Sequence, residues 1–205
     1  MKHSQVVAAL KSGLNTLIAA ETEITEYDTM VGDGDCGLCL KGGAQAILAE
    51  IEKHNEWSDA VQLISRIAHV VESNMDGTSG ALYAIFLNSL AYNLSLQDKG
   101  QASPTTAKIW AKALQGALTS LGKYTPARPG DRTMVDALQP FVNTLVETED
   151  FTKAVEAAKK GSESTQGMEA SLGRSVYVGG DNWKKVPDPG AFGLAQLLAG
   201  INLVL

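Results

Sequence analysis

The chain contains only two cysteines among its 205 residues and no long apolar run. A single pair of cysteines excludes the multi-disulfide framework of small secreted proteins. No stretch reaches the roughly 18 apolar residues that a membrane-spanning helix requires, and the N-terminal residues lack the apolar core of a signal peptide. We therefore expect a soluble cytoplasmic protein.

Positive charge is also scarce. The 17 lysines and arginines are outnumbered by 23 aspartates and glutamates, which gives a formal net charge of −6. This balance, without any basic patch, argues against nucleic acid or an anionic membrane surface as a partner. The apolar content of 44% is enough for a hydrophobic core, and the length is that of a single domain over residues 1–205.

No segment shows the sustained alternation of apolar and polar residues that is typical of a strand. Apolar residues recur instead at helical spacing in eight stretches. The sequence therefore predicts an all-α protein, an antiparallel bundle or barrel of eight amphipathic helices. We place the first helix at 4–23, the second at about 38–54, the seventh at about 152–172 and the last at about 191–202, and we expect the fifth to begin at Ser103 and Pro104.

Four turns rich in glycine and aspartate separate these helices, near residues 28–37, 74–80, 122–134 and 174–190. In an antiparallel bundle every second connection lies at the same end. The four turns occupy alternate connections, whereas the connections between them lack Asp-Gly clusters. We therefore expect one end of the bundle to collect the aspartates, an anion-binding turn and the arginines.

The first of these turns carries three aspartates, Asp28, Asp33 and Asp35, with glycines between them. Carboxylates that converge on one point repel one another unless a cation lies between them, and Mg²⁺ with oxygen ligands is the natural choice. Because Mg²⁺ divides its coordination between carboxylates and phosphate oxygens, the turn also indicates a phosphorylated ligand.

The same turn admits other interpretations. Its glycines spell the dinucleotide fingerprint G-x-G-x-x-G, but a helical pattern precedes them instead of a strand, and the intervening aspartates would repel a bare phosphate. A solvated acidic turn with an aspartate as helix cap stays open. Cys36 and Cys39 have the spacing of a redox pair or of two zinc ligands, yet the thioredoxin-like context and further ligands are missing.

Two further turns have functional and structural interpretations. Thr78 and Ser79 open an apolar helix, where free N–H groups and hydroxyls form an anion site; ordinary helix capping is the alternative. The turn over 122–134 holds two prolines and two arginines, which make it rigid, polar and partly basic. Its structural interpretation is a surface loop in which Asp131 caps the next helix.

Five motifs follow one another in a distinctive order. They are Asp28-x4-Asp33-Gly34-Asp35-Cys36-Gly37, Asp76-Gly77-Thr78-Ser79-Gly80, Pro129-Gly130-Asp131-Arg132-Thr133-Met134-x-Asp136-Ala137, Gly173-Arg174-Ser175 and Asp188-Pro189-Gly190-Ala191. Over essentially the whole chain they resemble the nucleotide-binding domain of dihydroxyacetone kinase, its L-type, C-terminal domain. The resemblance implies a barrel of eight antiparallel helices with ATP or ADP bound in the loops at one end.

The resemblance also implies roles for individual residues. Asp28, Asp33 and Asp35 would hold two Mg²⁺ ions that bridge the nucleotide phosphates. Main-chain and hydroxyl contacts to the phosphates would come from Cys36, Gly37, Leu38, Cys39, Thr78 and Ser79. The adenine and ribose would be bounded by Gly122, Met134, Asp188, Pro189 and Gly190, and Arg174 would reach the nucleotide.

The implied activity is transfer of the γ-phosphoryl group of ATP to dihydroxyacetone or a similar short ketose. No Walker G-x-x-x-x-G-K-[ST] motif and no kinase H-R-D motif occurs, so no catalytic residue is expected beyond the metal aspartates. The 205 residues contain no ketose-binding domain. We expect this kinase to be active only with such a domain, on a separate subunit or in a longer chain, and a homodimer formed through that partner.

Two alternatives stay open. Family members that depend on the phosphotransferase system carry histidine at the position of Cys36 and keep ADP as a cofactor, which a phosphohistidine protein rephosphorylates. The cysteine favours the ATP-dependent kinases. An alternative of another class is a non-catalytic nucleotide sensor that docks on a regulator.

Overall fold

The computed structural model describes residues 3–54, 57–97 and 106–205 of the chain. Within these ranges the protein forms nine α-helices, two short 3-10 helices and no strand, so the predicted all-α class is confirmed. None of the described helices is both long and apolar enough to cross a membrane. In chain order the elements are α1 (His3–Ala19), α2 (Glu21–Val31), α3 (Cys36–Lys53), α4 (Ala60–Asn74), α5 (Gly77–Gln97), α6 (Ala107–Leu121), α7 (Val135–Thr148), α8 (Phe151–Ser164), η1 (Arg174–Tyr177), η2 (Asn182–Lys184) and α9 (Pro189–Asn202).

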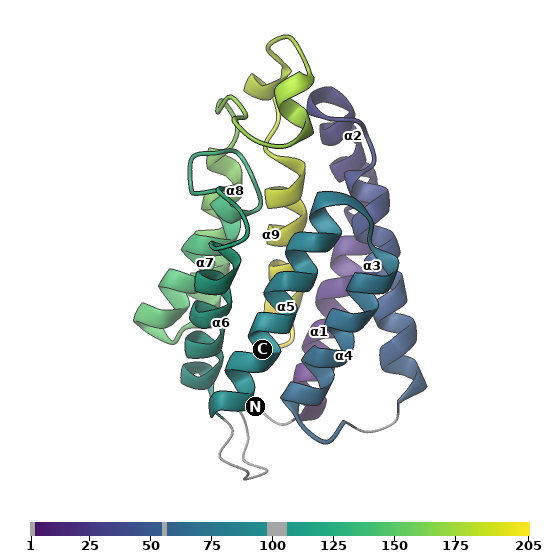
Figure 1. The fold of residues 1–205 in the computed structure, drawn as a ribbon, viewed down its shortest axis with the longest axis vertical. Helices are drawn as coiled ribbons and strands as arrows, with labels where there is room; N and C mark the ends of the chain where they lie inside the picture. Colours follow the sequence, from purple (N-terminus) through teal and green to yellow (C-terminus); the bar gives the residue numbers. More distant parts are fainter. Residues whose placement is uncertain (1–2, 55–56, 98–105) are drawn as a thin grey trace.

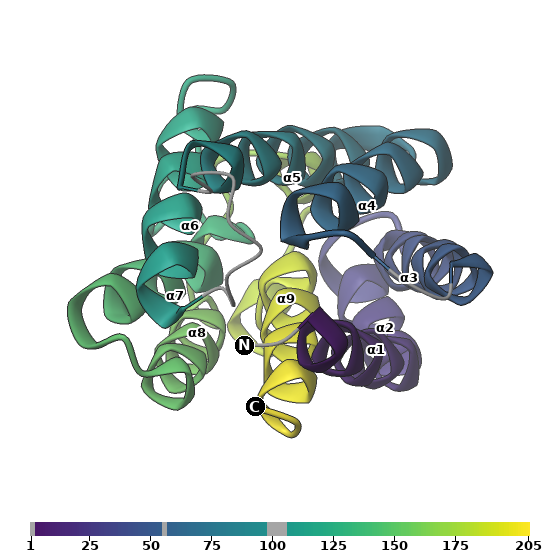
Figure 2. The same ribbon diagram turned by 90° about the horizontal axis from the view of Figure 1, so that it is seen from below.

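The helices form a closed barrel, which Figure 2 shows in a view along its length. α1 packs against α3, and from α3 to α8 each helix packs against the next in the chain. α9 lies between α8 and α1 and closes the ring. Each helix turns an apolar stripe inward; Leu63, Leu94, Leu121 and Leu145, from four successive helices, are fully buried.

The predicted first helix over 4–23 is in fact two helices. α1 ends at Ala19, and α2 begins at Glu21 and continues to Val31. The described residues therefore contain one helix more than the predicted eight. Asp28, which we expected in a turn, lies in α2, because Ile24, Asp28 and Val31 form its buried face at helical spacing.

Other predicted boundaries differ at their ends. α8 ends at Ser164 instead of near 172, and α9 begins two residues early, at Pro189. Proline fits the first position of a helix, and Asp188 caps this one by accepting the Ala191 N–H at 2.8 Å. The predicted helix start at Ser103 and Pro104 lies outside the described residues.

The glycine- and aspartate-rich turns do lie together at one end of the barrel. Figure 1 shows the α2–α3, α4–α5 and α6–α7 connections and the α8–α9 segment at the upper end, whereas the α7–α8 connection lies lower in the view. The alternation of helix directions thus brings these four segments together, as the sequence predicted. The upper end of the barrel therefore carries the candidate site residues of these four segments.

Candidate functional site

Three carboxylates converge at the upper end of the barrel. Ligand oxygens of Asp28, Asp33 and Asp35, one from each, all lie within 4.8 Å of one another. Asp28 is buried on α2, whereas Asp33 and Asp35 are exposed in the turn before α3. A set made only of carboxylate oxygens, open to solvent on one side, suits a hard cation such as Mg²⁺ that also keeps ligands from outside the protein.

The turn between α2 and α3 sets the orientation of Asp28. A Cβ atom on Gly32 would lie 2.1 Å from Oδ1 of Asp28, so any residue other than glycine would displace this carboxylate. Gly34 has a φ of 80°, a conformation that glycine adopts without strain. The Cys36 N–H, at the start of α3, donates to Oδ2 of Asp28 at 2.9 Å, and so a helix N-terminus holds the aspartate.

Negative charge accumulates in this cluster. Desolvation, followed by the charges of Asp33 and Asp28, raises the pKa of Asp35 above its usual range. Arg174 opposes this effect, since its Nη1 lies 2.9 Å from Oδ2 of Asp33. The part of this shift that comes from Asp33 and Asp28 is mutual repulsion, which a divalent cation among the three carboxylates would relieve.

The N-terminus of α5 is tied to the same region. Sγ of Cys39, in the first turn of α3, lies 3.8 Å from the main-chain oxygen of Asp76, which immediately precedes α5. Thr78 is exposed and Ser79 is half-buried, so a ligand can reach both. The N-termini of α3 and α5 therefore lie close to each other near the carboxylates, an arrangement that favours an anion such as phosphate.

The start of α9 supplies a third part of the site. Asp188 is buried, and its own N–H donates to Oγ1 of Thr165 at 2.7 Å. Burial raises the pKa of Asp188 to about 7, although the Ala191 N–H and the charge of Arg132 act in the opposite direction. Gly190 adjoins Met134, because a Cβ atom on this glycine would lie 3.8 Å from Cβ of Met134.

Most of the predicted site residues are thus brought together, whereas Gly122 is not. Cys36, Gly37 and Cys39 lie in the first turn of α3, Thr78 and Ser79 in that of α5, and Asp188, Pro189 and Gly190 at the start of α9. Gly122 follows α6, where its carbonyl accepts a hydrogen bond from Arg128. Leu38 lies in the same first turn of α3 and points its side chain to solvent, 58% exposed. Among the described contacts, Gly122 is not linked to the aspartates.

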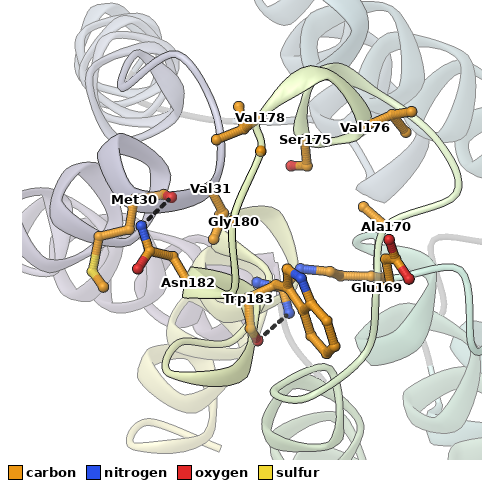
Figure 3. Close-up of a pocket in the computed structure, with 12 residues that line it drawn as sticks. Met30, Val31, Glu169, Ala170, Ser175, Val176, Val178, Gly180, Asn182 and Trp183 are labelled. Atoms are coloured by element: carbon orange, nitrogen blue, oxygen red, sulfur yellow. Dashed lines mark hydrogen bonds between the residues drawn. The ribbon is translucent and has the colours of Figure 1, made fainter.

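The segment between α8 and α9 contributes features that the sequence analysis did not assign. A cavity of about 190 Å³ lies between this segment and the end of α2 (Figure 3). Met30, Val31, Arg132, Asn182 and Trp183 are among its lining residues. The side-chain amide of Asn182 donates to the Met30 carbonyl at 3.3 Å. None of the predicted site residues lines the cavity, so it is distinct from the carboxylate cluster.

The fold and the cluster define an all-α barrel with a candidate divalent-metal site at one end. The DAK2 domain family matches residues 30–202, and the chain belongs to this family. Relatives include dihydroxyacetone kinase of Komagataella pastoris, 44% identical over 201 residues that cover 94% of this chain and 33% of the relative. The triokinase/FMN cyclase of Homo sapiens is 32% identical over 209 residues, which cover 98% of this chain and 35% of that protein.

Solved structures show the same fold. The native dihydroxyacetone kinase of C. freundii superposes with a TM-score of 0.78 at 26% identity, over 98% of this chain and 34% of the other. A structure of the C. freundii kinase in complex with AMP-PNP and Mg²⁺ gives a TM-score of 0.75, with the same identity and coverage. The chain thus spans about a third of the length of these relatives.

Proposed function

We propose that this chain is the nucleotide-binding, phosphoryl-donor domain of a kinase that acts on dihydroxyacetone or a similar short ketose. It would bind ATP or ADP together with two Mg²⁺ ions. The observation that carries the proposal is the convergence of Asp28, Asp33 and Asp35 within 4.8 Å, close to two helix N-termini. The C. freundii kinase, which shares the fold, was crystallised with AMP-PNP and Mg²⁺.

Each part of the site has a task in this proposal. The three aspartates hold the metal, and bound Mg²⁺ would neutralise the charge that develops on the phosphates during transfer. The Cys36 N–H fixes the orientation of Asp28. The Cys39 N–H donates to the Asp35 carbonyl, so the N–H groups of Gly37 and Leu38 remain at the start of α3. These, with the N–H groups that begin α5 and the hydroxyls of Thr78 and Ser79, would donate to phosphate oxygens.

The remaining predicted residues would hold the rest of the nucleotide. Arg174 offers a guanidinium fork, the geometry that matches phosphate oxygens. Met134 and the start of α9, from Asp188 to Gly190, would bound the adenine and ribose. Gly122 belongs to the proposed set on the resemblance alone.

The acceptor would be held elsewhere. The relatives are about three times as long as this chain, so we assign residues 1–205 to one nucleotide-binding domain and the ketose to a separate domain or subunit. That partner would also supply the base for the acceptor hydroxyl. Purified alone, the chain should bind Mg-nucleotide without producing triose phosphate.

Calorimetry with Mg-AMP-PNP tests the site. The Asp33→Ala variant should lose most of the Mg²⁺-dependent affinity, at least about tenfold, because it removes a carboxylate from the cluster. Asp181→Asn is a matched control, since Asp181 is an exposed aspartate at the same end and is paired with Lys184. Unchanged affinity in Asp33→Ala would overturn the assignment of the metal site.

Turnover with an added ketose-binding subunit tests the activity. ATP-dependent formation of triose phosphate supports the kinase. A requirement for a phosphohistidine protein in place of ATP would assign the chain to the ADP-cofactor type. Nucleotide binding without turnover in the presence of the partner would favour the non-catalytic sensor.

A further inference from the structure

Arg132 is the largest of the fully buried side chains, with 2% of its surface exposed. Charged side chains are almost never buried to this extent unless other groups compensate their charge. Burial lowers the pKa of Arg132, while the negative charges of Asp188 and Asp136 oppose that shift. Arg132 is therefore a buried cation whose charge other groups at this end of the barrel must compensate.

The guanidinium of Arg132 binds both ends of the segment that connects α8 to α9. We call residues 165–188 the strap. The Arg132 side chain donates to main-chain carbonyls of Thr165, Met168, Trp183, Val186 and Pro187. Nη1 serves the first three carbonyls and Nη2 the last two, so the two arms of the fork hold different parts of the strap together.

The backbone at Arg132 is itself in a constrained conformation. Its φ is 57°, which is rare for a residue with a side chain and persists only where the surroundings impose it. Asp136 imposes it here: its carboxylate accepts the N–H groups of Gly130 at 2.6 Å and Thr133 at 2.8 Å. The first turn of α7 thus holds the backbone on both sides of Arg132, and this fixes the direction of the Arg132 side chain toward the strap.

The strap carries Arg174 to the carboxylate cluster. The Arg174 side chain is 78% exposed, and the ion pair with Asp33 is its link to the barrel. A long, exposed side chain has little to hold it, because its rotamer entropy favours many positions. Its placement therefore depends on the backbone of η1. This short helix lies between the two parts of the strap that Arg132 holds, 165–168 and 183–187, and the Asn182–Met30 hydrogen bond ties the strap to α2.

We infer that Arg132 is a positioning residue for the phosphoryl-donor site: by clamping the strap, it holds η1 so that Arg174 meets the aspartate cluster and the nucleotide. The inference rests on the proposed function and adds to it a residue that does not touch the nucleotide. It predicts that Arg132 influences nucleotide affinity through Arg174.

A double-mutant cycle tests this coupling by calorimetry with Mg-AMP-PNP. Arg132→Lys keeps the charge but loses the fork, because an ammonium group cannot span both ends of the strap. We expect this variant to weaken binding about three- to tenfold and Arg174→Met about tenfold. The double variant should bind within about twofold of Arg174→Met alone, because without the Arg174 side chain the loss of Arg132 has no further effect on nucleotide affinity.

Hydrogen exchange gives a second readout without nucleotide. In Arg132→Lys the amides of 173–180 should exchange several times faster, while those of α4 stay unchanged. Arg66→Lys is the matched control: Arg66 pairs with Glu50 on α3 and should alter neither strap exchange nor affinity. If Arg132→Lys does not fold, Asn182→Ala releases the strap from Met30 without disturbing a buried charge. It should lower affinity in the same Arg174-dependent way.

The outcomes separate the inference from the proposed function. A wild-type chain that fails to bind Mg-AMP-PNP overturns the proposed function and this inference with it. Wild-type binding together with additive losses in the cycle, or with unchanged strap exchange in Arg132→Lys, overturns the inference and leaves the nucleotide site standing.

Discussion

Arg174 and Asp33 form an ion pair across the site, with Nη1 of the arginine 2.9 Å from Oδ2 of the aspartate. Asp33 is also one of the three candidate metal ligands. The guanidinium therefore competes with a cation for this carboxylate, while its remaining N–H donors can serve a phosphate. One arginine thus links the metal and the nucleotide parts of the proposed site, with opposite effects on the two.

Replacement of Arg174 by methionine should separate these effects. Without the competing cation, Mn²⁺ alone should bind about two- to fivefold more tightly, whereas Mg-AMP-PNP should bind about tenfold more weakly. Electron paramagnetic resonance can follow Mn²⁺, and calorimetry the nucleotide. Lys184→Met removes the same charge from an exposed side chain of the strap and is the control. Affinities that both move in one direction would contradict the dual role.

Replacement by alanine should lower Mn²⁺ affinity at one glycine of this region and leave it unchanged at another. In Gly32→Ala the new Cβ would lie 2.1 Å from Oδ1 of Asp28, so the carboxylate must move and Mn²⁺ affinity should fall at least about tenfold. Gly42 lies exposed within α3 and has no atom within 4 Å of its added Cβ. Gly42→Ala should raise the free energy of unfolding by roughly 0.5–1 kcal/mol and leave Mn²⁺ binding unchanged. Wild-type Mn²⁺ affinity in Gly32→Ala would show that Asp28 is not a ligand.

Asp188 should make the stability of the fold depend on pH. Burial raises its pKa to about 7 in the folded chain, against about 3.9 in the unfolded chain. The folded state therefore holds this proton more tightly, and the free energy of unfolding should decrease as the pH rises from about 4 to about 7, by at most a few kcal/mol. Above pH 7 this contribution levels off.

Urea unfolding of the Asp188→Asn variant measures this contribution. Asparagine keeps an oxygen that can accept the Ala191 N–H but does not titrate, so the decrease between pH 4 and pH 7 should be much smaller than in the wild type. Asp181→Asn, at an exposed position, should follow the wild-type curve. Parallel curves for wild type and Asp188→Asn would show that Asp188 does not change its pKa on folding.

Nucleotide should stabilise one end of the barrel more than the other. Mg-AMP-PNP at about 100 times its dissociation constant should add about 2.7 kcal/mol of stability. In hydrogen exchange, protection should increase in residues 28–37, 74–80, 122–134 and 174–190. The turn between α7 and α8 lies away from these segments (Figure 1) and should show no change. Equal protection of this turn and the four segments would contradict a site at one end.

The sequence was sufficient for the fold class and for the end of the barrel that carries the candidate site. Both depend on helical periodicity and on the alternation of helix directions, which are local and additive signals. The three aspartates were also predictable as a group, because they fall within eight residues with glycines between them. The structure brings their ligand oxygens within 4.8 Å of one another.

The positions of Asp28 and Arg132 needed the tertiary structure. The residues before Asp28 are rich in glutamate and threonine, so their apolar periodicity was too weak to predict that the helix continues through Asp28. In the structure, Ile24 and Val31 lie with Asp28 on the buried face of α2. Arg132 lies in a polar turn whose composition predicts a surface position, but it is buried against five carbonyls of the strap, which is distant in sequence. Because every residue has a main-chain carbonyl, the sequence does not indicate which carbonyls will accept hydrogen bonds from a buried arginine. Arg132 therefore occurred within a motif but could not be given a role.

The closure of the barrel by α9 also affects how the chain can fold during synthesis. Ser12 Oγ of α1 donates to the Gly200 carbonyl of α9 at 2.7 Å, so the first and last described helices are neighbours in space. Until α9 leaves the ribosome, the inner faces of α1 and α8 have no partner to close the ring. Contacts of such long sequence separation slow folding, and the open intermediate exposes apolar surface that favours aggregation or chaperone binding.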